Sequence, residues 1–317
     1  MYKRIIVTGS VAYDHIMSMP SRFGDHILPD KIHIINVSFI MERFRREFGG
    51  TGGNISYNLS LLNVKSNLIA TVGNDFHEYL THLRKQKHID TSKIKIYKKV
   101  PTASGFVMTD QDDNQIWGFY EGAMRYANKI SLAKIFKKGD FLVIAPNNPL
   151  AMIRYAKEAV AAGIDYMFDP AFNIPHIPTY NLKEALENAK VVIGNDYEIA
   201  LILERIGWNL HELLDATDIV VTTMGKDGSV ISKDGKIIKI KSAKTQKKII
   251  DPTGAGDAYR AGFLSGFIKG APLKTCGQLG ATCSVYTVDR NGTQTHHFTK
   301  TEFLKRYKDN FNEDLKI

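Results

Sequence analysis

The chain has 317 residues, of which 44% are hydrophobic, and this size and composition fit one large domain with a sizeable core. No apolar run approaches the roughly 18 residues that cross a bilayer, and the first residues lack the apolar stretch of a secretory signal. We therefore expect a cytoplasmic protein without a membrane partner. The net charge is +9, from 42 lysines and arginines against 33 aspartates and glutamates. Because the basic stretches lack the interleaved aromatic residues of a stacking surface, we expect no nucleic-acid partner either.

Short apolar runs alternate along the chain with longer amphipathic segments. This alternation is typical of strands and helices that build a parallel sheet covered on both faces. The expected strands are 5–7, 67–70, 141–144, 166–168, 191–193 and 219–221, and the expected helices are 54–62, 149–162, 182–189, 198–205 and 210–215. The predicted fold class is therefore α/β, with helix layers on both sides of a mostly parallel central sheet.

Two blocks interrupt the alternation. Residues 11–37 contain no clear helix and look like short strands, and residues 95–122 contain a β-hairpin whose turn is 110–114 (DQDDN). Strands that leave an α/β core in this way predict a small β-sheet lid. We expect one domain over residues 1–317, with its core at 1–10, 38–94 and 123–317 and its lid at 11–37 and 95–122.

The segment 251–257 (DPTGAGD) carries the clearest chemical signal. Gly254 and Gly256 permit a tight turn, and the residues from Asp257 onward have helical character. A glycine-rich turn that opens a helix points backbone N–H groups at an anion, and the helix dipole adds to the attraction. Asp257 can accept the proton of a hydroxyl group there, although a lone aspartate at a helix start more often caps the helix.

This segment resembles the carboxy-terminal motif of the ribokinase-like, or PfkB, carbohydrate kinases. A second cluster, 48–54 (FGGTGGN), is similar to the substrate loop of the same family. It is not the G-x-G-x-x-G of a dinucleotide-binding fold, and the chain has no G-x-x-x-x-G-K-S/T phosphate loop. The resemblance implies an ATP-dependent kinase in which Asp257 is the catalytic base and Gly254, Ala255 and Gly256 surround the transferred phosphoryl group.

The resemblance also implies nucleotide and metal ligands. Asn195 and Glu198 (NDYE, 195–198) match the N-x-x-E motif of the family, with Asn195 near ATP and Glu198 binding Mg²⁺ indirectly. An ion held by few carboxylates, waters and phosphate oxygens suits that role. Asp251 is expected at a K⁺ site, with capping of its own turn as the alternative. The expected ATP contacts beneath the phosphates are Thr223, Gly225 and Gly228.

The acceptor site is implied by the same family. Asp14 matches an early carboxylate that accepts hydrogen bonds from vicinal sugar hydroxyls, and Gly50 and Asn54 belong to the substrate loop. The segments 115–124, 257–262 and 292–298 are similar to the nucleoside and adenosine kinase branch. In that branch Phe119 is expected to stack on the nucleobase.

Three functions stay open at this point. The first is an ATP-dependent kinase of the 5′-hydroxyl of adenosine or of purine nucleosides more broadly. The second is a kinase of ribose, fructose or a related sugar, in which Phe119 only packs the lid. The third is a non-catalytic, nucleotide-binding regulatory protein, which the presence of Asp257 and Glu198 disfavours. The expected partners are ATP, Mg²⁺ and the small acceptor, and the chain is expected to be a monomer or a homodimer.

Overall fold

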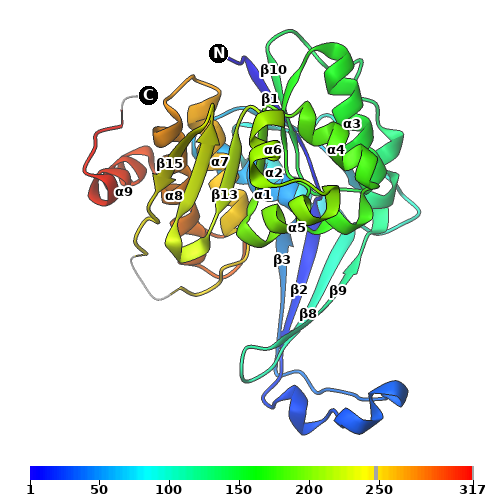
Figure 1. The fold of residues 1–317 in the computed structure, drawn as a ribbon. Helices are drawn as coiled ribbons and strands as arrows, with labels where there is room; N and C mark the ends of the chain where they lie inside the picture. The colour runs from blue at the N-terminus through cyan, green and yellow to red at the C-terminus, as the bar shows by residue number, and fades with distance from the viewer. Residues whose placement is uncertain (246–248, 316–317) are drawn as a thin grey trace.

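The most apolar strands of the chain assemble into one central sheet. In the computed structural model, which describes residues 1–245 and 249–315, nine strands follow the order β15-β14-β13-β12-β11-β10-β1-β4-β6 (Figure 1). They are β1 (Arg4–Thr8), β4 (Ser66–Ile69), β6 (Ile89–Asp90), β10 (Asp140–Ile144), β11 (Asp165–Phe168), β12 (Val191–Asn195), β13 (Val220–Thr223), β14 (Ser229–Lys233) and β15 (Lys236–Ile240). The strands from β6 to β13 in this order are parallel, and β14 and β15 add an antiparallel hairpin at one edge.

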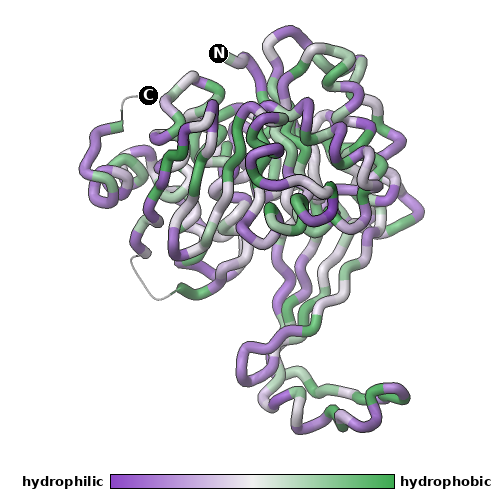
Figure 2. The backbone as a smooth tube through the Cα atoms, in the orientation of Figure 1, coloured by the Kyte–Doolittle hydropathy of each residue, from purple (hydrophilic) through white to green (hydrophobic). Residues whose placement is uncertain are grey.

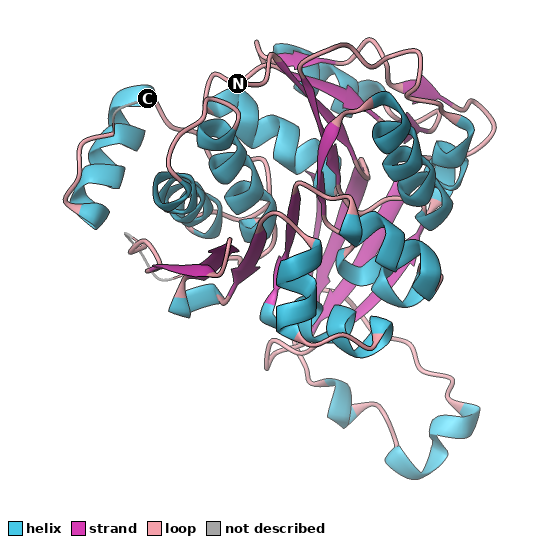
Figure 3. Cartoon of the chain, turned by 45° about the horizontal axis from the view of Figure 1, so that its top comes forward, coloured by secondary structure: helices cyan, strands magenta, loops and turns pink. Residues whose placement is uncertain are grey.

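Successive residues of each strand point to two hydrophobic cores, one on each face of the sheet. Ile5 and Val7 of β1 lie in one core, and Ile6 between them lies in the other. The first core is covered by α1 (Thr51–Leu61), α2 (His77–Lys85), α7 (Ala255–Phe267), α8 (Leu273–Val288) and α9 (Lys300–Phe311). The second is covered by α3 (Pro149–Ala162), α4 (Thr179–Glu187), α5 (Asp196–Ile206) and α6 (Leu210–Ala216) (Figure 3). These three layers confirm the predicted α/β fold class.

A second sheet of four strands projects from the core, and we call it the lid sheet. Its order is β3 (Arg43–Gly49), β2 (Ala12–Ser18), β8 (Ala103–Thr109) and β9 (Gln115–Tyr120). The predicted hairpin forms β8 and β9, but β3 falls within 38–94, which we had assigned to the core. Most residues of β3 are exposed or half-buried, so its sequence, RFRREFG, has no alternation of apolar and polar residues. The strand could therefore not be predicted from its sequence pattern. A further short sheet pairs β5 (Thr71–Val72) with β7 (Lys95–Ile96) in parallel.

The connection between β2 and β3 forms an arm at the tip of the lid sheet (Figure 1). Short strands were expected throughout 11–37, but after Ser18 the arm contains two 3-10 segments, Phe23–Asp25 and Pro29–Ile34. Figure 2 shows apolar residues spread along this arm. The most exposed of them are Leu28, Ile32, Ile34, Ile35 and Ile40.

Most predicted core elements are found with small shifts of their ends. Helix α3 spans its expected range, whereas α1 begins three residues before the expected position because Gly50, at φ +84°, turns the chain directly from β3 into the helix. Helix α2 was not predicted, because its only buried side chains are Tyr79 and Leu83. Within the described residues, no helix is both long and apolar enough to cross a membrane.

Candidate active site

The candidate site lies where several parallel strands end together. Asp169 directly follows β11, Asn195 is the last residue of β12, and Thr223 is the last residue of β13. Since parallel strands present their carboxyl ends at one edge of the sheet, these residues share that edge with the first turn of α7. Ligands of open α/β sheets bind in the crevice at this edge, beside the point where the strand order changes direction. Here that change lies between β1 and β10.

The first turn of α7 is built as predicted for an anion site. Gly254 caps the helix at φ +78°, and a Cβ there would also stand 2.8 Å from Cγ2 of Thr293. The N–H of Ala255 is already bonded to the carbonyl of Pro252 at 3.2 Å. Among the described residues, no hydrogen bond uses the N–H groups of Gly256 and Asp257. These two, rather than that of Ala255, are open to an anion.

Asp257 is buried at this turn, with 9% of the residue exposed. Nδ2 of Asn54 donates to Oδ2 of Asp257 over 2.9 Å, so α1 and α7 meet at the carboxylate. Burial raises the pKa of Asp257 to about 6, and the Arg260 charge and the Asn54 hydrogen bond partly oppose that rise. The predicted base and the predicted substrate residue Asn54 are thus brought into direct contact.

Two residues that the sequence analysis did not single out hold Asn54 in place. Its Oδ1 accepts a hydrogen bond from Oγ1 of Thr293 at 2.7 Å and another from Nε2 of Gln294 at 2.9 Å. Because Nε2 of Gln294 donates to Oδ1, the amide nitrogen faces Asp257, while the single proton of the Thr293 hydroxyl is shared between Oδ1 and the carbonyl of Phe48 at 2.8 Å. Gln294 is held in turn by Tyr79 and by Nε2 of His82 at 3.1 Å. Thr293 and Gln294 lie in 292–298, and the resemblance of this segment to the nucleoside kinase branch was the one feature of the sequence that could have indicated their role.

Asp14 lies on the face of the lid sheet that is near Asp257, whereas Tyr13 beside it, on the opposite face, packs into the hydrophobic core. Gly49 of β3 and Gly105 of β8 flank it, and a Cβ at Gly49 would overlap the carboxylate oxygen Oδ2. The two glycines therefore make the space in which the carboxyl lies. Within the described residues, no hydrogen bond reaches the carboxylate of Asp14, whose backbone pairs with β3 and β8. Burial, followed by the negative charge of Asp257, raises the pKa of Asp14 to about 7.

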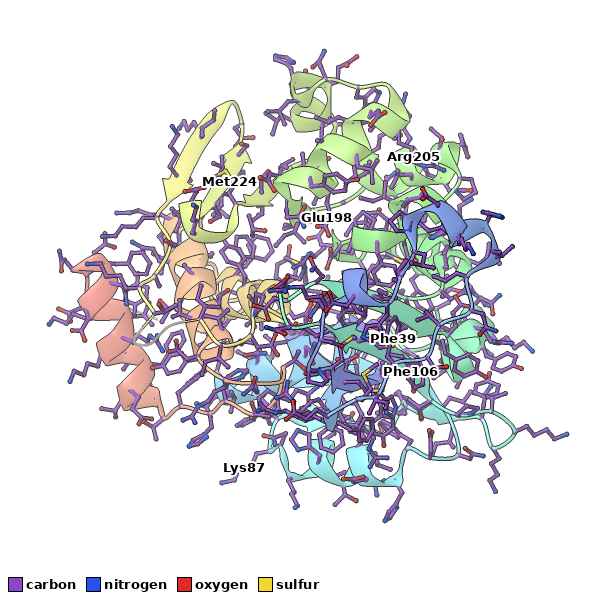
Figure 4. The ribbon with its side chains drawn as sticks, turned by 90° about the horizontal axis from the view of Figure 1, so that it is seen from below. Phe39, Lys87, Phe106, Glu198, Arg205 and Met224 are labelled. Carbon is purple, nitrogen blue, oxygen red and sulfur yellow. The ribbon has the colours of Figure 1, made fainter. Side chains whose placement is uncertain are left out.

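Phe119 shares this face of the lid sheet with Asp14. It pairs with Gly105, which pairs with Asp14, so the three lie in one row across β9, β8 and β2. Its ring lies 6.1 Å from that of Phe172, which belongs to the segment after β11. Phe119 is 46% exposed and Phe172 is 53% exposed. Phe106 lies on the opposite face of the lid sheet, stacked on His15 at 4.7 Å (Figure 4).

A buried ionic cluster surrounds the base. Asp169 and Arg260, neither predicted as a site residue, form an ion pair in which Nη2 of Arg260 donates to Oδ1 of Asp169 over 2.7 Å. Glu198 lies at the start of α5 (Figure 4). Its N–H donates to Oδ1 of Asn195 over 2.7 Å, and the N–H of Asn195 donates to Oε2 of Glu198 over 2.8 Å. Burial, and next the charge of Asp169, raises the pKa of Glu198. In the structure this motif therefore also forms the capping box of α5.

A cavity of about 610 Å³ lies beside the first turn of α7. It reaches from Ala255 and Gly256 to the turn after β13, and its lining includes the predicted ATP contacts Thr223, Gly225 and Gly228 but not Asn195. An apolar group lines another part, which the sequence had not indicated: Ile249, Pro252, Ala281, Val285 and Val288. The size and mixed lining suit a nucleotide whose base is covered by apolar side chains.

Asp251 ties two loops of the site together. Its Oδ1 accepts the N–H of Thr253 at 2.9 Å, and its Oδ2 accepts the N–H of Gly292 at 3.2 Å. Capping of its turn, the alternative considered for this residue, is thus observed. No group of three or more His, Cys, Asp or Glu side chains that could hold a metal ion directly is found in the part of the chain that the structure describes.

Known proteins with the same architecture give this geometry a context. Residues 8–300 match the pfkB family carbohydrate kinase. The chain is 32% identical to the nucleoside kinase of Methanothermobacter thermautotrophicus over 307 residues, which cover 96% of this chain and 95% of that protein. The nucleoside kinase of Burkholderia thailandensis in complex with inosine matches with a TM-score of 0.89 and 30% identity, over 99% of this chain and 100% of that one. The same kinase in complex with ADP-inosine matches with a TM-score of 0.87 and 31% identity, over 98% and 97% of the two chains.

The raised pKa of Asp14 leads to a prediction for the ligand-free protein. Because this pKa is higher in the folded state than its ordinary value of 3.8, ionisation of Asp14 lowers stability progressively as the pH rises toward about 7. Asp14→Asn avoids that loss and should stabilise the fold by on the order of 1 to 3 kcal/mol at pH 8 and far less at pH 4. Urea unfolding at both pH values measures the difference, with Asp165→Asn, at the opposite edge of the sheet, as control. An equal gain at pH 4 and pH 8 would contradict the burial argument.

Proposed function

The chain belongs to the pfkB family of carbohydrate kinases, and from this premise we propose that it transfers the γ-phosphoryl group of ATP to the 5′-hydroxyl of a nucleoside. The observation that carries the proposal is the position of Asp257. It lies between the nucleotide-sized cavity that reaches Gly256 and the lid face that bears Asp14. A base at that boundary can take a proton from an acceptor on one side while the phosphoryl group arrives from the other.

The acceptor is held through its sugar in this proposal. Asp14 accepts hydrogen bonds from the two vicinal ribose hydroxyls, and the remaining N–H of the Asn54 amide donates to one of them. The 5′-hydroxyl then lies at Asp257, which is ionised above about pH 6 and takes its proton. The open N–H groups of Gly256 and Asp257, with the dipole of α7, offset the negative charge on the phosphoryl group in transit.

The aromatic residues favour a nucleoside over a free sugar. Phe119 lies in the row that contains Asp14, and its ring is tilted by 56° against that of Phe172, which follows β11 outside the lid sheet. Both rings are large and partly exposed. A flat base gains about 0.5 to 1.5 kcal/mol from stacking on such a ring beyond its area burial. The inosine and ADP-inosine complexes of the Burkholderia enzyme support a purine nucleoside as the acceptor class and ATP as the donor.

The residues present fit Mg²⁺ as part of the donor complex. The carboxylates of buried Asp169 and Asp257 and of half-buried Glu198 lie near one guanidinium, so the cluster has an excess of negative charge. Oε2 of Glu198 accepts the capping hydrogen bond of α5, so Oε1 is left to interact with an ion that water and ATP oxygens would coordinate. Bound with ATP, Mg²⁺ supplies positive charge between the phosphates. Asp251, which links the loops at Thr253 and Gly292, is proposed to support a K⁺ site.

The acceptor prediction decides between nucleoside and sugar. Inosine or adenosine should be phosphorylated with a higher kcat/KM than ribose or fructose. Phe119→Ala should lower kcat/KM for the nucleoside about tenfold, because about 1.4 kcal/mol of stacking corresponds to that factor, and should leave activity on free sugar nearly unchanged. Phe106→Ala is the matched control, since Phe106 is similarly exposed on the other face of the lid sheet. ATP-dependent product formation measures all of these, and a free sugar that exceeds every nucleoside would replace the proposal with the sugar kinase.

Loss of the proposed base should abolish most turnover without unfolding the chain. Asp257→Asn keeps the shape of the side chain and an acceptor for Asn54 but cannot take a proton, so kcat should fall about 10²- to 10⁴-fold. ADP affinity, measured by calorimetry, should stay close to that of the wild type. Asp165→Asn provides the control. A variant that retains more than half of the wild-type kcat would show that Asp257 is not the base.

The ion proposal has its own test. Activity should require Mg²⁺, and Glu198→Gln should raise the Mg²⁺ concentration that gives half-maximal activity, because one negative charge near the ion is lost. Glu212→Gln is the matched control, since Asn209 and Glu212 form the same capping box at the start of α6. Equal Mg²⁺ dependence of the two variants would remove Glu198 from the metal site. Equal activity in KCl and in choline chloride would remove the K⁺ site.

A further inference from the structure

Arg260 is a buried cation at the cleft that the steps above do not use. It lies one turn after Asp257 on α7, and 7% of the residue is exposed. Its Nη2 donates to Oδ1 of Asp169 over 2.7 Å, and its Nε pairs with Oδ2 of the same carboxylate. Only the Nη2 contact has hydrogen-bond geometry, but the ion pair as a whole is a fork in which two guanidinium nitrogens lie against one carboxylate, and this restricts the orientation of the guanidinium. Because Asp169 is fully buried at the end of β11, the fork is anchored to the central sheet.

The third nitrogen of the guanidinium, Nη1, lies against Gly256. Long side chains on a helix lean toward its amino end, and a Cβ built on Gly256 would stand 2.6 Å from Nη1. In the described part of the chain Nη1 makes no hydrogen bond, and it is not one of the fully buried polar atoms without a partner. Gly256 lines the nucleotide-sized cavity. Nη1 therefore lies directly behind a glycine that lines the cavity, although Arg260 itself is not one of the lining residues.

The contact with Arg260 also explains the glycine at position 256. Gly256 is not among the residues with positive φ, so its backbone conformation is open to other residues. A side chain there would instead collide with Nη1. The glycine keeps the guanidinium close to the turn whose N–H groups are open to an anion.

The charge of Arg260 reaches the other ionisable groups of the site. It lowers the pKa of Asp257 and that of Glu198, against the larger effect of burial. Asp169 and Arg260 are both anchored before any ligand arrives, so the positive charge needs no rearrangement to act. Preorganised charge of this kind in a site closed to water is the most effective form of transition-state stabilisation.

We propose that Arg260 is a catalytic residue whose Nη1 donates to the phosphoryl group in transit, while Asp169 is the residue that positions it. The proposal rests on the proposed kinase function. In the transfer, a bond forms between the acceptor oxygen and the γ-phosphorus, and the bond from the γ-phosphorus to the bridging oxygen of ADP breaks. The acceptor proton passes to Asp257. Arg260 keeps its proton throughout and offsets negative charge on the equatorial oxygens.

The test removes the buried pair as a unit, because deletion of one partner leaves an unpaired buried charge. The double variant Arg260→Met, Asp169→Leu is compared with Arg4→Met, Asp140→Leu. Arg4 and Asp140 form a similar fork at the amino ends of β1 and β10, on the far edge of the sheet. Circular dichroism and thermal melting establish folding. The readouts are kcat with ATP and inosine, and the affinities for ADP alone and for ADP with aluminium fluoride, a mimic of the phosphoryl group in transit.

The Arg260→Met, Asp169→Leu variant should lose about 10²- to 10³-fold in kcat, the usual effect of removing one donor to a developing charge. Its affinity for ADP should be nearly unchanged, whereas the tighter binding given by aluminium fluoride should be lost. The Arg4 and Asp140 control should retain wild-type values. A kcat within about threefold of wild type would overturn the proposal. An equal loss of affinity for ADP alone and for ADP with aluminium fluoride would also overturn it. Full recovery of kcat at pH 9 would also overturn it, because Arg260 would then only keep Asp257 ionised.

Two further variants decide the matter if the double variant does not fold. Arg260→Lys keeps a cation but loses the fork, and Gly256→Ala displaces the guanidinium while leaving it charged. Each should lower kcat and the fluoride-dependent affinity, and their combination should cost less than the sum of the two. Additive effects would overturn the proposal, because the two residues would then act independently. If the wild type phosphorylates no acceptor, the kinase function fails; if it does so and all variants stay active, only the role of Arg260 fails.

Discussion

The hydrogen bond between Asn54 and Asp257 joins the parts of the molecule on which the site depends. Asn54 lies on α1, which the chain enters directly from lid strand β3, and Asp257 lies on α7, which begins at a glycine turn. Thr293 and Gln294 hold the oxygen of Asn54, so a loop from the end of the chain fixes which side of the amide faces the carboxylate. Three segments far apart in the sequence thereby define one buried acid group and its neighbours.

The site contains several carboxyl groups whose burial destabilises their charged form, and this feature distinguishes it as a functional site. Burial raises the pKa of Asp14 to about 7 and that of Asp257 to about 6, and the charge of Asp257 adds to the rise at Asp14, as those of Asp169 and Glu198 do at Asp257. A fold selected only for stability would place hydrogen-bond donors or apolar groups there. Strongly perturbed acids that line a cleft are more typical of a functional site. Arg260 reduces the repulsion but does not remove it, and a ligand with hydroxyl donors and a cation would reduce it further.

The lid sheet has two faces with different tasks. One face carries Asp14 and Phe119, with Asp14 near Asp257, and glycines at 49 and 105 leave room for the carboxyl group. The other face carries the stacked rings of His15 and Phe106. Since side chains alternate along a strand, a shift of one residue in the pairing of β2 with β8 would turn Asp14 away from the site. The register of these strands therefore sets the geometry of the acceptor side.

The sequence by itself determined the α/β class, most strands of the core, the glycine turn before Asp257 and the resemblance that pointed to a kinase. These features are local: apolar runs, a helix start and short motifs can be read without knowledge of the fold. Strand β3, with no apolar alternation, could not be read in this way, and the lid boundary was misplaced as a result. Only the tertiary structure brought Asn54 to Asp257, Gln294 to Asn54, and Arg260 to Asp169, because these contacts join segments that are far apart in the sequence. The pKa values were likewise decided there, since burial and neighbouring charges do not exist until the chain is folded.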